Sequence, residues 1–147
     1  MEKIDIYTDG SCVGNPGPGG WSFIIKFDNK KTKEFSGSEN HTTNNRMELT
    51  AAINAINYFN KKVIINIYTD SKYLKEGITT WIKKWKINNW KTSNKNDVKN
   101  CDLWKLLDEK IKDHKINWIW VKGHNDNILN EKADKLARQA IKKKKTK

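Results

Sequence analysis

The sequence is short of cysteine and of long apolar runs, and each shortage excludes a class of protein. Its two cysteines, Cys12 and Cys101, are too few and too far apart for a disulfide framework or a zinc site, so we expect reduced thiols. No apolar stretch approaches the roughly 18 residues of a membrane-spanning helix. The first residues also lack the apolar segment of a signal peptide. We therefore expect a cytoplasmic protein that has no contact with membranes.

Arginine is scarce as well, yet the chain is strongly basic. Arg46 and Arg138 are the only arginines among 29 Lys and Arg residues, against 17 Asp and Glu, and the formal net charge is +12. A small protein with such a surface most often meets a polyanion, either nucleic acid or an anionic membrane. Residues 142–147 hold five of the lysines and form a basic tail, which leaves +7 on the body of the chain.

The 147 residues fit one domain, taken here as residues 1–147. Apolar alternation and apolar runs predict five strands, at residues 3–8, 21–27, 32–38, 63–69 and 116–121. The run at 63–69 is β-branched throughout, which is typical of a strand buried on both faces. The run at 116–121 is also apolar. The segment GNPGPGG at 14–20 is expected to be a tight turn, because its prolines and glycines do not suit a central strand.

Helical spacing of apolar residues begins at residue 44 and predicts a first helix of about four turns. Further helices are expected at 71–87, at about 100–111 and from 129 onward. Strands joined by short turns form an antiparallel meander, whereas strands separated by a helix are parallel. The expected fold class is therefore α/β, with a mixed five-stranded sheet of three antiparallel strands followed by parallel strands, and with helices on both faces.

Two strands end on nearly the same letters, IYTDG at 6–10 and IYTDS at 67–71. If these strands are neighbours, Asp9 and Asp70 leave the sheet at one edge, about 4.8 Å apart. Two carboxylates at ~4 Å repel by about 4 kcal/mol at an effective dielectric constant of 20, so a cation would stabilise the pair. Mg²⁺ prefers such oxygen ligands. The alternative is that each aspartate caps a turn.

Two further acidic residues and one histidine are candidates for the same site. Glu48 lies on the sheet-facing stripe of the first helix, although Asn45 as a cap with Glu48 closing a capping box is an alternative. Asp134 borders the apolar stripe of the last helix, and its alternative is an i,i+4 ion pair with Arg138. His124 follows the last strand, where a histidine is most often simply solvated.

The blocks TDGSCVGNPGPGGW, TTNNRMELTAAI, IYTDSKY, WIKKWK, WVKGH and NEKADKLA occur in this order. Together they span nearly the whole chain and resemble the type 1 ribonuclease H family in its bacterial form, which cleaves the RNA strand of RNA/DNA hybrids. The resemblance implies a ribonuclease H-like fold and a four-carboxylate site on Asp9, Glu48, Asp70 and Asp134. Two Mg²⁺ ions, or Mn²⁺ in their place, would bind there with the hybrid. They would drive hydrolysis to 5′-phosphate and 3′-hydroxyl ends, and His124 would assist proton transfer.

The resemblance also implies the substrate contacts. They are Gly10, Cys12, Asn15, Thr43, Asn44, Asn45, Lys72, Trp81, Lys83, Lys84, Trp85, Lys86 and Asn100. Thr43 and Asn100 match a pocket for a DNA phosphate, and residues 81–86 match a basic handle that grips the DNA strand. The family often has Gln where Lys72 stands; because lysine donates but cannot accept, a phosphate contact is expected there.

Each of these contacts has a structural alternative. The polar side chains could serve only as helix caps, and we expect Trp81 and Trp85 to be mainly local core with the lysines of the handle outward. Two rival functions also explain part of the pattern. One is a non-catalytic nucleic-acid-binding module, and the other is a transposase-like or junction-resolving nuclease that cuts DNA. We expect a monomer without an obligate protein partner.

Overall fold

The computed structural model describes residues 2–122 and 127–145. Its strands are β1 (Lys3–Cys12), β2 (Gly17–Lys26), β3 (Thr32–Thr42), β4 (Ile64–Thr69) and β5 (Lys115–Trp120). Its helical segments are α1 (Asn44–Asn57), α2 (Lys72–Glu76), the π-helical turn η1 (Gly77–Trp81), α3 (Ile82–Ile87), α4 (Cys101–Lys110), the 3₁₀ turn η2 (Ile111–Asp113) and α5 (Ile128–Lys145). All five predicted strands are present, and the helical region predicted at 71–87 comprises α2, η1 and α3.

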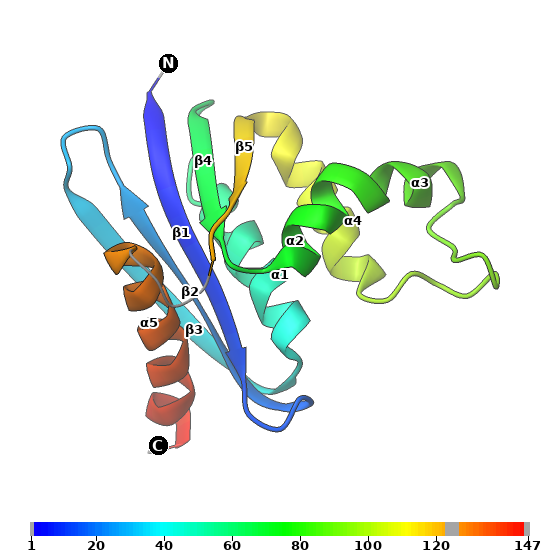
Figure 1. Ribbon diagram of the computed structural model, residues 1–147, viewed down its shortest axis with the longest axis horizontal. Helices are drawn as coiled ribbons and strands as arrows, with labels where there is room; N and C mark the ends of the chain where they lie inside the picture. Colours follow the sequence, from blue (N-terminus) through cyan, green and yellow to red (C-terminus); the bar gives the residue numbers. More distant parts are fainter. Residues whose placement is uncertain (1, 123–126, 146–147) are drawn as a thin grey trace.

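The strands form one sheet in the order β3-β2-β1-β4-β5 (Figure 1). β1, β2 and β3 pair antiparallel, whereas β4 pairs parallel with both β1 and β5. This is the mixed sheet that the connection lengths predicted, because short turns reverse the chain and a helical crossover restores its direction. The predicted fold class is confirmed.

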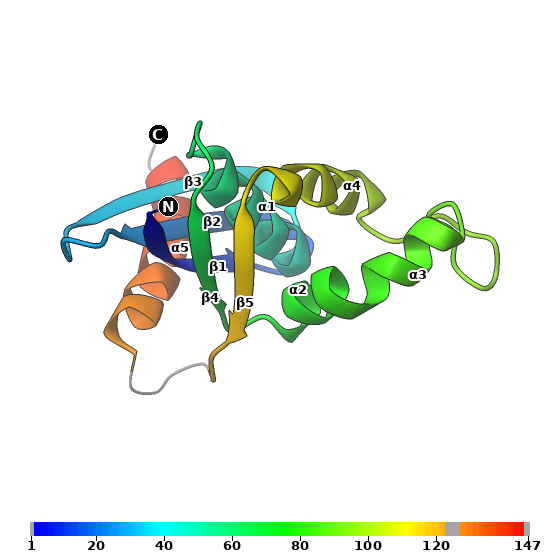
Figure 2. The ribbon, with the colours of Figure 1, turned by 90° about the horizontal axis from the view of Figure 1, so that it is seen from above.

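Helices cover both faces of the sheet, with α1 and α4 on one side and α5 on the other (Figure 2). The period of two along β1 divides its side chains between these layers. Ile4 and Ile6 belong to the large core cluster on the α1 side, while Tyr7 packs with Ile24 and Ala133 on the α5 side. The two faces of β1 therefore meet two different helices, α1 and α5.

The prediction that 63–69 is buried on both faces is wrong. In β4, Ile65 and Ile67 are buried while Asn66 and Tyr68 are only half-buried. The reason is that α5 packs on β1, β2 and β3, so the α5 side of β4 is only partly covered. β5 is the edge strand and has no fully buried residue, despite its apolar sequence.

The segment 14–20 is not only a turn, because β2 already begins at Gly17. Pro18 lies at a register shift in the pairing of β2 with β3, where its missing N–H removes no ladder bond. A Cβ on Gly20 would lie 2.1 Å from the carbonyl oxygen of Ala137, so α5 can pack this closely on β2 only over glycine. In the sequence, glycine in this segment argues against a central strand, but at Gly20 it is what allows α5 to cover β2.

Candidate active site

The parallel pairing of β1 with β4 brings the two IYTD segments into register. Tyr7 pairs with Tyr68 at the end of the ladder, so Asp9 and Asp70 follow at equivalent positions two residues later. Asp70 comes directly after β4 as predicted, but β1 continues beyond Asp9 to Cys12 in its pairing with β2. Asp9 is therefore held within a strand, with only 3% of its surface exposed, and is not a turn cap.

Glu48 reaches this pair because α1 packs directly on β1. A Cβ at Gly10 would lie 2.5 Å from the backbone nitrogen of Glu48, so only glycine permits this approach. Glu48 is 4% exposed, and Asp9, Glu48 and Asp70 each offer an oxygen such that all three lie within 4.8 Å of one another. Carboxylates from two strands and one helix thus converge at one edge of the sheet.

The convergence is electrostatically costly without a cation. Burial raises the pKa of Asp9, and the charges of Glu48, Asp70 and Asp134 raise it further. Burial likewise raises the pKa of Glu48, followed by the charge of Asp70. Among the described residues, Oδ2 of Asp9 and Oε1 of Glu48 are buried without a hydrogen-bond partner. Unpartnered acceptor oxygens that repel one another fit a divalent cation with oxygen ligands.

Asp134 approaches the cluster from the other face of the sheet, on α5. Its negative charge contributes to the raised pKa of Asp9. Its Oδ2 also accepts the ion pair from Nη2 of Arg138 at 2.8 Å, so the contact expected from the i,i+4 alternative is present as well. Asp134 therefore lies near Asp9 and is also ion-paired with Arg138 on its own helix.

The capping-box interpretation of Glu48 is wrong. The N-cap of α1 is Thr43, whose Oγ1 accepts from the backbone N–H of Arg46 at 3.2 Å. Glu48 is thus free of capping and points into the cluster. The loop between β1 and β2 is bonded to the first residue of α1, because Oδ1 of Asn15 accepts from the N–H of Asn44 at 2.7 Å.

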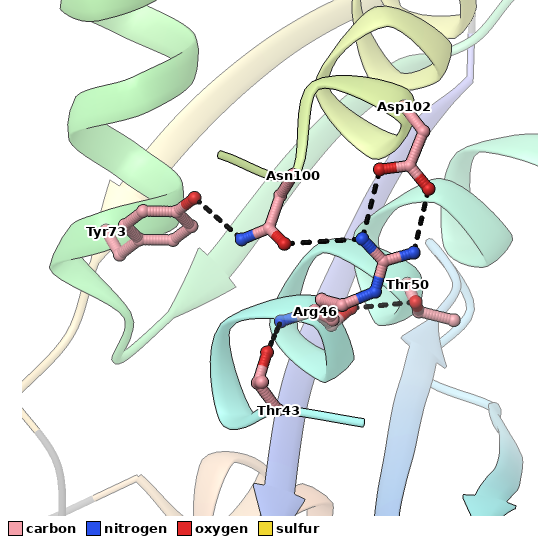
Figure 3. A network of polar contacts seen from close by, with 6 residues as sticks. All are labelled: Thr43, Arg46, Thr50, Tyr73, Asn100 and Asp102. Carbon is pink, nitrogen blue, oxygen red and sulfur yellow. Dashed lines mark hydrogen bonds and ion pairs between the residues drawn. The ribbon is translucent and has the colours of Figure 1, made fainter. Parts of the chain in front are cut away.

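Arg46 joins two predicted substrate contacts into one network (Figure 3). Its guanidinium donates to both carboxylate oxygens of Asp102, at 3.0 and 2.8 Å, and to Oδ1 of Asn100 at 3.3 Å. The amide of Asn100 donates to the hydroxyl of Tyr73 at 3.0 Å. Because Thr43 caps the same turn, the structure brings Thr43 and Asn100 together at the junction of α1 and α4.

The remaining loop residues lie near the start of α1. The thiol of Cys12 donates to the carbonyl of Thr42 at 3.3 Å, so it is held by backbone at the end of β3. Asn44 is exposed and Asn45 is half-buried in the first turn of α1. Gly10, Cys12 and Asn15 are therefore gathered beside this turn rather than spread over the surface.

The handle, residues 81–86, projects away from the sheet together with the loop that follows it (Figures 1 and 2). Trp85 packs against the core cluster as expected, but Trp81 remains 39% exposed. Trp81 contacts the rings of Tyr73 and Trp85 in edge-on and tilted arrangements. All three lysines of the handle are exposed, and Lys86 pairs with Asp108 at 3.2 Å.

Lys72 meets an aromatic partner that the sequence did not predict. Its Nζ lies 4.9 Å from the centre of the Trp120 ring, within cation–π range. The indole N–H of Trp120 donates to the backbone carbonyl of Asp70 at 3.1 Å. Trp120 therefore links Lys72 to the backbone of the cluster. The predicted catalytic residue His124 lies outside the described residues.

Sequence reasoning missed Asn130 and Glu131, which help to line a small pocket of about 50 Å³ at the cluster. It is lined by Asp70, Asn130, Glu131 and Asp134. Asn130 and Glu131 lie in the block NEKADKLA, but nothing in their spacing distinguishes them from ordinary residues in the first turn of a helix. Their position depends on how the start of α5 meets the end of β4.

Comparison with known proteins decides the family. Residues 1–142 match the RNase H family model, described as RNase H. The chain belongs to the ribonuclease H family. It is 55% identical over 141 residues to Ribonuclease H of Ehrlichia ruminantium (strain Gardel), with 96% of each chain covered. It is also 55% identical over 141 residues to Ribonuclease H of Bradyrhizobium sp. (strain ORS 278), with 96% of this chain and 91% of the relative covered.

Solved ribonuclease H structures share the fold. LC9-RNase H1, described as a type 1 RNase H with the type 2 active-site motif, superposes with a TM-score of 0.87 at 29% identity, over 97% of this chain and 74% of that one. The foamy viral protease-reverse transcriptase in complex with RNA/DNA hybrid superposes with a TM-score of 0.78 at 22% identity, over 93% of this chain and 20% of that one. The second likeness concerns the fold alone.

The predicted enzyme is thereby confirmed as a ribonuclease H, which hydrolyses the RNA strand of RNA/DNA hybrids. Membership excludes the binding-module and DNA-nuclease alternatives. The family uses divalent metal, and the acidic cluster fits that requirement. Across residues 2–122 and 127–145, no helix has the length and apolar character that crossing a membrane requires.

Proposed function

We propose that this ribonuclease H hydrolyses the RNA strand at the carboxylate cluster, where Asp9, Glu48, Asp70 and Asp134 hold two Mg²⁺ ions, with Mn²⁺ as a substitute. The observation that carries the proposal is the convergence of three acidic oxygens within 4.8 Å from β1, α1 and the end of β4. Two of these side chains have buried oxygens without a partner among the described residues. Buried carboxylates that repel one another are stable only when protonated or bound to a cation.

The four carboxylates divide by position. The charges of Glu48, Asp70 and Asp134 all raise the pKa of Asp9, so Asp9 is the side chain that we assign to both ions. Glu48 and Asp70 lie with Asp9 in one group, whereas Asp134 approaches Asp9 from the opposite face of the sheet. The four carboxylates would hold the metal, and the metal would supply activation of the attacking water and stabilisation of the leaving 3′ oxygen in the in-line displacement. The chain itself supplies a rigid set of ligands and no nucleophilic side chain.

We further propose that the hybrid extends from the cluster toward the handle. The DNA phosphate would contact Thr43 and Asn100, supported by their common network with Arg46. The sugar and base contacts would come from Gly10, Cys12, Asn15, Asn44 and Asn45. Phosphate contacts further along would come from Lys72, Trp81, Lys83, Lys84, Trp85 and Lys86, supported by the exposure of the basic side chains. The assistance of His124, the monomeric state and the cytoplasmic location stay predictions.

The test is cleavage of end-labelled RNA/DNA, RNA/RNA and DNA/DNA duplexes of one sequence, with Mg²⁺ or with EDTA, by wild type and two variants. Asp9→Asn should lower cleavage of the RNA strand by more than the ~10–100-fold typical of residues that only support a ligand. Asp5→Asn is the matched control: Asp5 lies on the same face of β1, but its Oδ1 accepts from Asn66 at 3.0 Å. Full activity of Asp9→Asn, or equal losses in both variants, would overturn the proposed site.

A further inference from the structure

The buried side-chain amide of Asn130 has no structural role among its described contacts. It lies in the first turn of α5 and is 4% exposed. Its Oδ1 has no hydrogen-bond partner among the described residues. The backbone N–H of Asn130 donates to Oδ1 of Asn127 at 3.0 Å, so Asn127 already caps the helix. Leaving a buried acceptor unpaired costs about 1–3 kcal/mol, so a hydrogen-bond donor outside the described residues is expected at this oxygen.

The pocket that Asn130 lines shows what that partner must be. Its other lining side chains are Asp70, Glu131 and Asp134, and its volume is about 50 Å³. One water needs roughly 10–15 Å³ of such space, so the pocket admits one or a few waters. Ionised carboxylates and an amide oxygen accept hydrogen bonds but do not donate them. The occupant must therefore donate hydrogen bonds to these oxygens and offset their negative charge. Water molecules bound to a divalent cation do both.

We propose that Asn130 is a positioning residue whose side-chain oxygen accepts a hydrogen bond from a water bound to the divalent ion near Asp134. The inference deepens the proposed function and rests on it. Asp134 lines the same pocket as Asn130, and its charge acts on Asp9, so Asn130 lies beside a carboxylate that would hold the ion. A neutral amide suits this place because it orients water without adding another charge to a site where carboxylates already repel.

Asn130 differs from its neighbour Glu131 in that its side chain carries no charge. Glu131 is exposed at the rim of the pocket, where its charge is screened by solvent. Asn130 is buried, and its acceptor keeps the same charge at every pH of interest. The water it holds is thus fixed by geometry rather than by titration.

The experiment is calorimetric titration of the metal-free full chain with MgCl₂ and, separately, MnCl₂. Asn130→Ala removes the acceptor and should weaken metal binding about 10-fold, the lower end of the loss typical of residues that support a ligand. Asn130→Asp keeps an acceptor of the same shape and should bind metal at least as tightly as wild type. Gln139→Ala is the control, because Gln139 is an exposed amide on the same helix that lines a different pocket.

Urea unfolding in EDTA separates this role from a merely structural one. A packing role would lower the unfolding free energy of Asn130→Ala without changing the metal dissociation constant, and that result would overturn the proposal. If Asn130→Ala folds poorly, Asn130→Leu fills a similar volume without an acceptor and must show the same loss of metal affinity. Unchanged affinity in Asn130→Leu would refute the inference. Asp9→Asn serves as reference: unchanged metal binding there would instead refute the proposed function.

Discussion

Replacing Asp9 with asparagine should make the metal-free protein more stable while it destroys cleavage. In the wild type, Asp9 is 3% exposed and faces three other carboxylates without a cation. Asparagine has nearly the same shape but no charge, so it removes both the burial of a charge and the repulsion. The carboxylate cluster therefore lowers the stability of the metal-free protein while it allows metal to bind. Asp9→Asn should raise that stability and weaken metal binding.

The expected gain follows from the geometry. Two unit charges at 4.8 Å repel by about 3.5 kcal/mol at an effective dielectric constant of 20. Protonation limits this cost, because holding a proton at pH 7 on a carboxyl of ordinary pKa 3.8 requires roughly 4 kcal/mol. We therefore expect Asp9→Asn to raise the unfolding free energy in EDTA at pH 7 by about 2–4 kcal/mol.

The pH dependence has a definite sign. The folded state raises the pKa of Asp9 and of Glu48 above their ordinary values of 3.8 and 4.5. Above about pH 4 the unfolded chain releases these protons while the folded chain retains them, so the metal-free stability falls as pH rises. Each such group contributes up to ~1.4 kcal/mol per pH unit until the pH passes its folded pKa. Asp9→Asn should show a shallower fall than wild type between pH 4 and 7.

The assay is urea unfolding of wild type, Asp9→Asn and Asp5→Asn, each in EDTA and in Mg²⁺. Wild type should gain stability in Mg²⁺ and Asp9→Asn should gain much less, because binding to the folded state alone stabilises it. Asp5→Asn should not be stabilised, since Asp5 accepts a hydrogen bond from Asn66. If Asp9→Asn is no more stable than wild type in EDTA, the repulsion deduced from the cluster is refuted.

Three further variants test separate parts of the molecule. Exchanging Lys83, Lys84 and Lys86 for alanine should weaken hybrid binding. The slope of log affinity against log salt concentration should fall in magnitude by about two to three, because each phosphate contact contributes nearly one. Binding assays at several salt concentrations measure the slope, and an unchanged slope would refute the binding role of the handle. Gly10→Ala should lower the unfolding free energy in urea by about 1–3 kcal/mol and lower activity, because the added Cβ meets the backbone of α1 at 2.5 Å. Unchanged stability and activity would contradict that packing. Arg138→Ala should tighten Mg²⁺ binding a few-fold in calorimetry by releasing the fourth carboxylate, and weaker binding would show that the ion pair assists the site.

Much of the fold was predictable because it depends on local patterns. The change from a period of two to helical spacing located the strands and helices, and the connection lengths determined which strands are parallel. The burial of β4 and β5 was not predictable in this way. Both are apolar in sequence, but α5 packs mainly over β1, β2 and β3, so β4 and β5 are covered less. An apolar run indicates that a strand can be buried, and only the neighbouring layers decide whether it is.

For the site, the sequence by itself determined which carboxylates are candidates, because a repeated Asp after matched strands and acids on sheet-facing stripes are visible in one dimension. Only the tertiary structure decided that Thr43 rather than Asn45 caps α1. It alone also decided that Asn130 lies buried beside Asp134, with its Oδ1 unpaired among the described residues. Such relations join segments far apart in the chain at distances of a few ångströms. Periodicity indicates the face on which a side chain lies, whereas its contacts depend on how closely two backbones approach, as α1 does over Gly10.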